Sequence, residues 1–330
     1  MDAATFPDGR SLKPHVLVLM ATYNGERYLA EQIDSILDQK DVDVSLLITD
    51  DCSKDGSYEI AQEHAQADSR IISKQNQNNA GVGMNFLNML YDVDSANCDY
   101  VAFSDQDDVW LNDKLTTACT AIVEKENDPD ARRVEPFGIP VLYCSELQNV
   151  DQNLNNPKLE LEALNIKQDK RATPLMRNYY SGCTMVMNKA MVRLLQSARL
   201  GNVYRLHDVW SALVGRYCAN FIIDVENARI LRRITGVNTC GAITPGMDIA
   251  NASVARLSNS PERRMSKTAA QLYECFGQYM SCDDAEMIRS FSWVNESLAS
   301  RIRWALRDDY RGTTISETLL MKAKILFGRY

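Results

Sequence analysis

The stretch HVLVLMATYNGERYLAEQIDSILDQ, residues 15–39, joins a short apolar run to a polar loop and then to an amphipathic segment. The run at 15–21 is apolar at nearly every position, which is typical of a strand buried on both faces. In the segment that follows, Leu29, Ile33, Ile36 and Leu37 fall on one stripe of a helix. The stretch therefore predicts a strand, a loop and a helix in that order.

The same pattern recurs toward the C-terminus. Strands are predicted at 44–50, 70–75 and 98–104, and helices at 55–66 and 83–93 lie between them. Such alternation implies a mostly parallel sheet with helices on both faces, in which ligands bind outside the carboxyl ends of the strands. The polar segments TYNGE, TDDCSKDG and SDQDDVW each directly follow a predicted strand. We therefore expect all three to line one edge of the sheet.

The second half of the chain is patterned less regularly. Further strands are predicted at 141–147, 179–188, 221–225 and 228–234, helices at 189–198 and 207–218, an exposed loop at 148–160, and a mainly helical region beyond about 251. These segments extend the α/β pattern and add a helical C-terminal region.

Composition excludes several classes of protein. At 330 residues and 45% hydrophobic residues the chain can bury a large core. The net charge of −8 disfavours a general nucleic-acid binder. Nine scattered cysteines without a CxxC pair indicate neither a disulfide framework nor a zinc site, and favour a reducing cytoplasm. Neither a signal peptide nor a membrane-spanning run is predicted.

Three carboxylates crowd the end of the strand predicted at 98–104. Asp105, Asp107 and Asp108 occupy three of four positions there, where repulsion and burial both disfavour ionisation. A divalent hard cation would relieve that repulsion and hold a diphosphate. The alternative is a solvated turn whose aspartates cap the next helix. The pattern alone leaves both interpretations open.

Two more segments offer ligand contacts. Asp50 and Asp51 end the second strand, where a carboxylate accepts hydrogen bonds from a ribose hydroxyl or a base N–H. Capping of the next helix by Asp51 or Ser53 is the alternative. Gly81 and Gly83 precede a helix and allow close backbone approach. No GxGxxG, P-loop or GxSxG pattern occurs, which disfavours dinucleotide-binding, P-loop and α/β-hydrolase proteins.

Taken together, the motifs VLMATYNGERYLAEQIDSIL, LLITDDCSKDGSYEIA, NNAGVGMNF and YVAFSDQDDVW resemble the inverting family 2 glycosyltransferases of the GT-A fold. The SDQDDVW form is similar to bacterial rhamnosyltransferases that build surface polysaccharides. The resemblance is strongest over 14–115 and weak beyond about 245. It implies a GT-A catalytic domain at 1–250, with a nucleotide-sugar half at 14–115 and an acceptor half at 140–250, followed by a helical region at 251–330.

The resemblance also implies roles for individual residues. It assigns Mn²⁺ or Mg²⁺ to Asp105 and Asp107, the acceptor-side base to Asp208, and the nucleotide sugar to Thr22, Tyr23, Asp51, Gly81, Asn85, Asp105 and Arg233. Arg232 and Asn238 are further candidate neighbours of the diphosphate. Related enzymes often carry a histidine where this chain has Ile234, so the metal is expected to rely on carboxylates, diphosphate and water. His207 either orients the site or is a buried structural histidine.

The expected reaction is a metal-assisted single displacement. A sugar, with L-rhamnose from dTDP-rhamnose as the first candidate, passes from a nucleotide-diphosphate donor to a glycan or lipid-linked glycan. A sugar-phosphate nucleotidyltransferase and a non-catalytic nucleotide- or glycan-binding module are the alternatives. Residues 251–330 carry 12 Lys and Arg against 9 Asp and Glu among apolar residues. That pattern fits peripheral binding to the cytoplasmic face of the inner membrane, and equally packing on the catalytic domain or in a homodimer.

Overall fold

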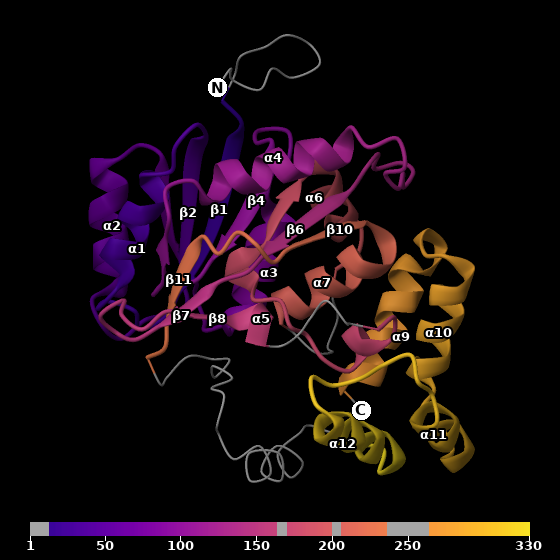
Figure 1. Ribbon diagram of the computed structural model, residues 1–330. Coiled ribbons are helices and arrows are strands. Elements are labelled where there is room, and N and C mark those ends of the chain that lie inside the picture. Colours follow the sequence, from indigo (N-terminus) through magenta and orange to yellow (C-terminus); the bar gives the residue numbers. More distant parts are fainter. Residues whose placement is uncertain (1–12, 164–169, 200–205, 236–263) are drawn as a thin grey trace.

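The computed structural model describes residues 13–163, 170–199, 206–235 and 264–330, and its centre is a seven-stranded sheet (Figure 1). The strand order is β10-β6-β9-β4-β1-β2-β3. The strands of this sheet are β1 (His15–Thr22), β2 (Asp43–Asp50), β3 (Ile71–Gln75), β4 (Tyr100–Ser104), β6 (Val141–Ser145), β9 (Val186–Asn188) and β10 (Asn220–Asp224). All pairings are parallel except those of β9, which runs antiparallel to β4 and β6. The predicted α/β fold with a mostly parallel sheet is confirmed.

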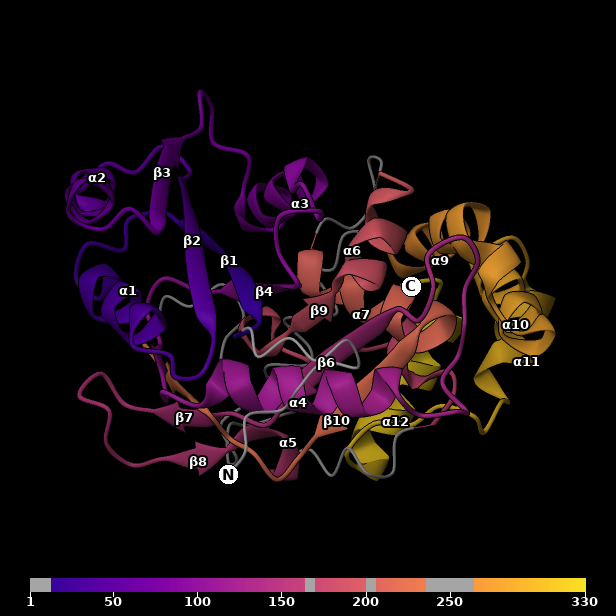
Figure 2. The same ribbon diagram turned by 90° about the horizontal axis from the view of Figure 1, so that it is seen from above.

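Helices cover both faces of this sheet, as Figure 2 shows. One face carries α1 (Leu29–Leu37), α2 (Ser57–Ala67) and α4 (Lys114–Glu126), and the other carries α3 (Val82–Asp92), α6 (Lys189–Gln196) and α7 (His207–Cys218). In β1, Val18 and Met20 pack into the core on the α1 side, and Leu19 packs into the core on the α3 side. This double burial explains why the first strand is apolar at nearly every position.

The predicted strand at 179–188 is largely wrong. Only β9, at its end, is a strand, and it is preceded by a 3₁₀ turn, η3 (Gly182–Thr184). The turn brings Cys183 to the edge of the sheet, fully buried. Because β9 runs antiparallel to β4 and β6, the chain enters it at the carboxyl edge of the sheet, directly after this turn.

A second, four-stranded sheet has the order β5-β11-β7-β8. Its strands are β5 (Val109–Trp110), β7 (Gln148–Val150), β8 (Lys158–Leu159) and β11 (Ile230–Arg233), and α5 (Glu160–Ala163) follows β8. The exposed loop predicted at 148–160 therefore contains two short strands. β8 pairs with β7, whereas β7 pairs on its other side with β11, some 80 positions away in the sequence, and local patterning does not reveal such a distant partner.

The C-terminal region is helical, as predicted. It consists of α9 (Arg264–Phe276), η4 (Gly277–Tyr279), α10 (Cys282–Ser292), α11 (Leu298–Ala305) and α12 (Ile315–Leu326), and a further 3₁₀ turn, η2 (Thr173–Leu175), lies near it. Phe276 of α9 packs on Trp210 of α7 with ring centroids 5.8 Å apart, so these helices share the core of that face. The domain boundary predicted near residue 250 lies outside the described residues and stays a prediction.

Gly215 lets α7 pack closely on the sheet. A Cβ atom at this position would lie 2.6 Å from Cδ2 of Leu142 on β6 and 3.1 Å from Cδ2 of Phe221 on β10. We expect Gly215→Val to lower the free energy of unfolding by about 1–3 kcal/mol through overpacking. Denaturant unfolding followed by circular dichroism measures this. Gln62→Val, at an exposed position of α2, is the matched control, and equal losses in the two variants would contradict the close packing.

Candidate functional site

The three polar segments that follow β1, β2 and β4 meet at the carboxyl edge of the large sheet, as predicted. Thr22, the last residue of β1, pairs with Asp50, the last residue of β2. On its other side β1 pairs with β4, so that Met20 lies opposite Ser104. The parallel register alone therefore places the acidic segment beside the loop that follows β1.

The loop after β1 is held by Gln106, a residue of the acidic segment. Its Oε1 accepts hydrogen bonds from Oγ1 of Thr22 at 2.8 Å and from the backbone N of Tyr23 at 2.7 Å. Its Nε2 donates to the carbonyl of Tyr23 at 3.1 Å. Thr22 is buried, whereas 47% of Tyr23 is exposed. The Tyr23 ring is thus available to stack on a flat ligand.

Asp51 organises a second loop. Its carboxylate accepts hydrogen bonds from the backbone N of Ala80, the backbone N of Gly81 and Nδ2 of Asn76, each at 2.8 Å. Gly81 has φ +78°, a conformation that favours glycine. Asn85 lies beneath this loop, where its Nδ2 donates to the carbonyl of Thr49 at 2.9 Å. Asp51 therefore positions the backbone of this loop.

The alternative that Asp51 or Ser53 caps the next helix is wrong. Helix α2 begins at Ser57, four to six residues further on, and neither side chain caps its first turn. Ser53 instead donates its backbone N and its Oγ to the carboxylate of Asp50. The two aspartates that end β2 are thus both used to hold the loops of the carboxyl edge.

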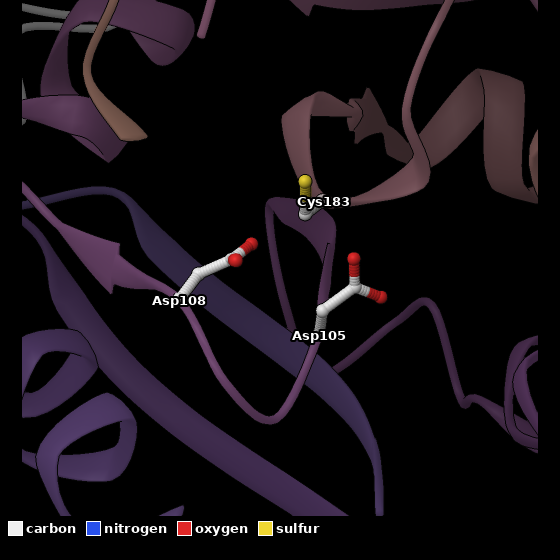
Figure 3. A group of neighbouring side chains, drawn as sticks. All are labelled: Asp105, Asp108 and Cys183. Carbon is white, nitrogen blue, oxygen red and sulfur yellow. The ribbon is translucent and has the colours of Figure 1, made fainter. Parts of the chain in front are cut away.

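The acidic cluster occupies the loop between β4 and β5, as Figure 3 shows. One ligand atom each from Asp105, Asp108 and Cys183 lies within 4.8 Å of the others. Asp108 is fully buried, and neither of its carboxylate oxygens accepts a hydrogen bond from a described residue other than this neighbouring thiol. Burial raises the pKa of all three aspartates, that of Asp107 to about 6, and their mutual repulsion adds to the rise for Asp107 and Asp108.

These side chains fit a divalent cation. Buried carboxylate oxygens without donors are the ligands that hard cations prefer, and a bound cation would reverse the rise in their pKa. The structure groups Asp108 and Cys183 with Asp105, whereas the sequence pairs Asp105 with Asp107. The assignment of the metal to Asp105 and Asp107 therefore stays a prediction.

Lys114 is a buried residue of this cluster that sequence reasoning missed. Its Nζ lies 3.4 Å from the centroid of the Trp110 ring, and burial lowers its pKa to about 7. Trp110 ends β5 and Lys114 begins α4, so helical spacing does not predict their contact. No local pattern in the sequence reveals that Lys114 is close enough to Asp108 and Cys183 for them to affect its pKa.

The two arginines at the end of β11 approach the cluster from the second sheet. Arg232 forms an ion pair with Glu160 and donates to Oγ of Ser181 at 2.8 Å. Arg233 is buried, and its guanidinium donates to Glu31 at 2.5 Å and to the carbonyl of Asp107 at 3.1 Å. Arg233 thus supports the acidic loop from behind. Asn238, the other candidate from this segment, lies outside the described residues.

Asp208 stands on the first turn of α7, as predicted. Its carboxylate accepts from Nδ2 of Asn178 at 3.1 Å and from the backbone N of Val209 at 2.7 Å, and burial raises its pKa to about 6. Asp208 also contributes to the raised pKa of Asp105, after burial as the larger cause. Asn178 is a second residue that sequence reasoning missed, because its contact spans 30 positions.

His207 is structural. It is buried against Phe86, with ring centroids 4.0 Å apart, and against Phe103 at 4.8 Å. Burial lowers its pKa to about 3, so the ring is neutral. Neither ring nitrogen is hydrogen-bonded to a residue that the structure describes. A side chain at Gly182 would collide with this ring, which explains the glycine in the turn before β9.

Comparison with known proteins identifies the family. The family model described as glycosyl transferase family 2 matches residues 17–193, more than half of the chain. The chain belongs to glycosyl transferase family 2. The resemblance read from the four sequence motifs is thereby confirmed. Asp51, Asp105 and the turn at Cys183 all lie within the part of the chain that the family 2 model matches.

Curated relatives match about a third of this family 2 chain. The dTDP-rhamnosyl transferase RfbG of Shigella flexneri is 45% identical over 106 residues, which cover 32% of this chain and 37% of the relative. The glycosyltransferase GlyA of Streptococcus pneumoniae is 33% identical over 113 residues, which cover 34% of this chain and 16% of the relative. The chain thus spans less than half the length of these curated relatives.

Solved structures confirm the GT-A type of fold. The crystal structure of residues 1–349 of TarS from S. aureus in complex with UDP matches with a TM-score of 0.52 at 16% identity, covering 96% of this chain and 89% of that one. The complex of TarS 1–349 with UDP-GlcNAc matches with the same TM-score at 14% identity, covering 96% of this chain and 93% of that one. At such identities the likeness concerns the fold. In the part of this chain that the structure describes, no helix has the length and apolarity needed to cross a bilayer.

The carboxylate of Asp51 is expected to control nucleotide binding through the loop it holds. Asp51→Ala leaves two backbone N–H groups and one side-chain amide without an acceptor, at about 1–3 kcal/mol each if they stay buried. We expect at least a tenfold loss of affinity for a nucleoside diphosphate, measured by calorimetry with dTDP and UDP in Mn²⁺.

Asp94→Ala is the control for this variant. Asp94 also accepts a backbone N–H, that of Ala96 at 3.0 Å, but in an exposed turn before β4. Its variant should bind as the wild type does. Wild-type affinity in Asp51→Ala, with the fold intact by circular dichroism, would show that this loop does not contribute to nucleotide binding.

Proposed function

We propose that the protein is an inverting glycosyltransferase that moves a sugar from a nucleotide-diphosphate donor to a hydroxyl group of a growing glycan. The observation that carries this proposal is the proximity of two differently suited carboxyl groups. Asp105 belongs to the acidic cluster at the end of β4, and Asp208 on α7, whose pKa is raised to about 6, is near enough to contribute to the raised pKa of Asp105. Such an arrangement offers a site for the donor diphosphate next to a base for the acceptor.

The donor site is built from the loops at the carboxyl edge. In the proposal the nucleobase of the donor stacks on the exposed ring of Tyr23, and the ribose lies along Thr22 and the loop held by Asp51. The diphosphate then reaches the acidic cluster, where Asp105 and Asp107 hold Mn²⁺ or Mg²⁺. A bound cation neutralises the charge that develops on the leaving diphosphate. Arg232 and Arg233 hold the surrounding segments in place.

Asp208 acts as the base in this proposal. Its carboxylate takes the proton of the acceptor hydroxyl while that oxygen attacks the anomeric carbon from the side opposite to the diphosphate. The new glycosidic C–O bond forms as the bond to the diphosphate oxygen breaks, so the configuration inverts. Asn178 donates to one oxygen of Asp208 and fixes the direction of the carboxylate. A pKa near 6 keeps Asp208 ionised at neutral pH yet basic enough to accept a proton.

The donor is proposed to be dTDP-rhamnose. The support is the relative from Shigella flexneri, whose name states that it is a dTDP-rhamnosyl transferase and which is 45% identical to this chain over 106 residues. The acceptor is proposed to be a glycan, free or lipid-linked, in surface polysaccharide synthesis. A lipid-linked acceptor requires the protein to work at the membrane surface, to which it binds peripherally.

Donor hydrolysis tests the reaction class. We expect slow release of dTDP from dTDP-rhamnose in Mn²⁺, loss of this release in EDTA, and its recovery when excess Mn²⁺ is added, because the leaving diphosphate needs the cation. Ion chromatography of the nucleotides measures the products. Release of pyrophosphate instead would indicate a nucleotidyltransferase. No release from dTDP-rhamnose or from a panel of other nucleotide sugars would indicate a non-catalytic binding module.

Substitution of Asp208, the proposed catalytic base, separates binding of the donor from transfer of the sugar. We expect Asp208→Asn to bind dTDP-rhamnose with nearly wild-type affinity and to lose transfer by about 10²- to 10⁴-fold, because an amide cannot take the acceptor proton. In the wild type the transfer rate should fall as the pH drops below about 6, where Asp208 becomes protonated.

Glu126→Gln is the matched control for Asp208→Asn. Glu126 is also partly buried with a raised pKa, but it lies at the end of α4, near the opposite edge of the sheet, where it accepts a hydrogen bond from Asn188. Its variant should keep the rate and the pH profile of the wild type. An unchanged rate in Asp208→Asn would remove this residue from the mechanism.

A further inference from the structure

Large exposed apolar side chains gather on the C-terminal helices. In the part of the chain that the structure describes, eleven large hydrophobic residues are exposed, and eight of them lie between residues 293 and 327. These eight form what we call the C-terminal apolar surface: Trp293, Leu298, Ile302, Leu306, Ile315, Leu319, Leu326 and Phe327. Scattered apolar residues are normal on a protein surface, whereas such a concentration marks an interaction site.

The exposed residues follow the periodicity of their helices. Leu298, Ile302 and Leu306 are four positions apart along α11 and its C-terminal end, and 78% of Leu306 is exposed. The opposite side of α11 is already buried through Trp304. The apolar stripe on the outer side of α11 therefore does not contribute to the packing of the protein core.

Helix α12 repeats this arrangement. Ile315 and Leu319 lie one turn apart and are 81% and 61% exposed, while Met321 and Ile325 pack inward. The two helices lie against each other, since Arg301 of α11 donates to the carbonyl of Leu326 at 3.0 Å. Both helices of the pair thus carry one apolar stripe for the core and a second one that is exposed.

The surroundings of this surface are basic. Residues 293–330 contain seven Lys and Arg against four Asp and Glu, in a chain whose net charge is −8. Two of the four acidic groups are neutralised within the protein, Asp309 by Arg307 and Glu317 by Arg177. Arg303, next to Ile302, and Arg329, next to Phe327, are exposed. The surface therefore combines apolar stripes with a positive rim.

The surface is also connected to the acceptor side of the proposed active site. Figure 1 shows α11 and α12 on the side of the molecule toward which the carboxyl edge of the large sheet faces. The segment 170–178 joins the two regions. The backbone N of Ala172 donates to the carbonyl of Asp309 at 2.8 Å, and Arg177 pairs with Glu317. The next residue, Asn178, donates to Asp208.

We propose that the C-terminal apolar surface binds an anionic lipid bilayer. The apolar stripes of α11 and α12 insert among the lipid headgroups, and the basic rim contacts the negative charge of the membrane. This inference rests on the proposed function through the lipid-linked acceptor, whose sugar would then meet Asp208 from the membrane side. A twofold dimer through the same surface would bring two basic rims together, so charge complementarity favours the anionic partner.

Vesicle flotation with the full-length protein tests this proposal. We expect at least about tenfold tighter binding to vesicles of phosphatidylcholine with phosphatidylglycerol than to phosphatidylcholine alone, and weakening by salt. The double variant Ile302→Ser, Leu306→Ser should lose most of its binding to both kinds of vesicle. Arg303→Glu should lose binding to the anionic vesicles selectively. Ile72→Ser, at a 57% exposed position of β3 remote from these helices, is the matched control and should bind as the wild type does.

Other results would overturn the proposal. Absence of vesicle binding by the wild type, or an equal loss of binding in Ile72→Ser, would contradict a membrane-binding role of this surface. Light scattering that shows a dimer for the wild type and a monomer for the double variant would assign the surface to a second copy of the chain.

Donor hydrolysis without vesicles keeps this test separate from the proposed function. The double variant should hydrolyse dTDP-rhamnose as the wild type does, because its substitutions lie outside the donor site. Hydrolysis without vesicle binding would disprove the membrane proposal alone. Vesicle binding without any hydrolysis would disprove the proposed function and leave the surface assigned to the membrane.

Discussion

The candidate site depends on the crowding of three aspartates after β4, a central strand of the sheet. Asp108 is fully buried and Asp105 and Asp107 are partly exposed, yet burial raises the pKa of all three. The neighbouring arginines offset this charge only in part, because Arg232 is paired with Glu160 and Arg233 with Glu31. Lys114, whose pKa is lowered to about 7, is a weak counter-charge. The loop is thus prepared for a cation from outside the chain.

The first half of the fold could be predicted from the sequence because its information is local. Apolar runs, amphipathic helices and the polar residues after each strand are readable within windows of a dozen residues. The parallel arrangement then brings Thr22, Asp51 and Asp105 to one edge whatever the details of the loops. The second half depends on distant pairings. The pairing of β7 with β11 joins segments some 80 positions apart, the turn at Cys183 has no periodic signal, and the short strands at 148–159 and this turn were missed.

In the candidate site, too, local signals could be read from the sequence and distant contacts could not. The positions of Asp51 and Asp208 could be predicted, but their partners could not. The carboxylate of Asp51 accepts hydrogen bonds from the backbone N atoms of residues 80 and 81, and that of Asp208 accepts one from Asn178. Both contacts join segments about 30 positions apart. His207 shows the reverse case, since a histidine beside a candidate base suggests chemistry until its aromatic surroundings are known. Residue type indicates which groups can act, and tertiary contacts decide how each one is used.

The segment 170–178 has a consequence for protein engineering. Exchange of C-terminal regions between related transferases is an obvious route to new acceptor specificity. In this protein such a chimera would separate Glu317 from Arg177 and Asp309 from Ala172, and with them the support of the segment that carries Asn178. Crossover points should therefore be chosen so that both sides of these contacts come from the same parent. A graft designed by linear domain boundaries alone would disturb the segment that donates a hydrogen bond to Asp208, the proposed base.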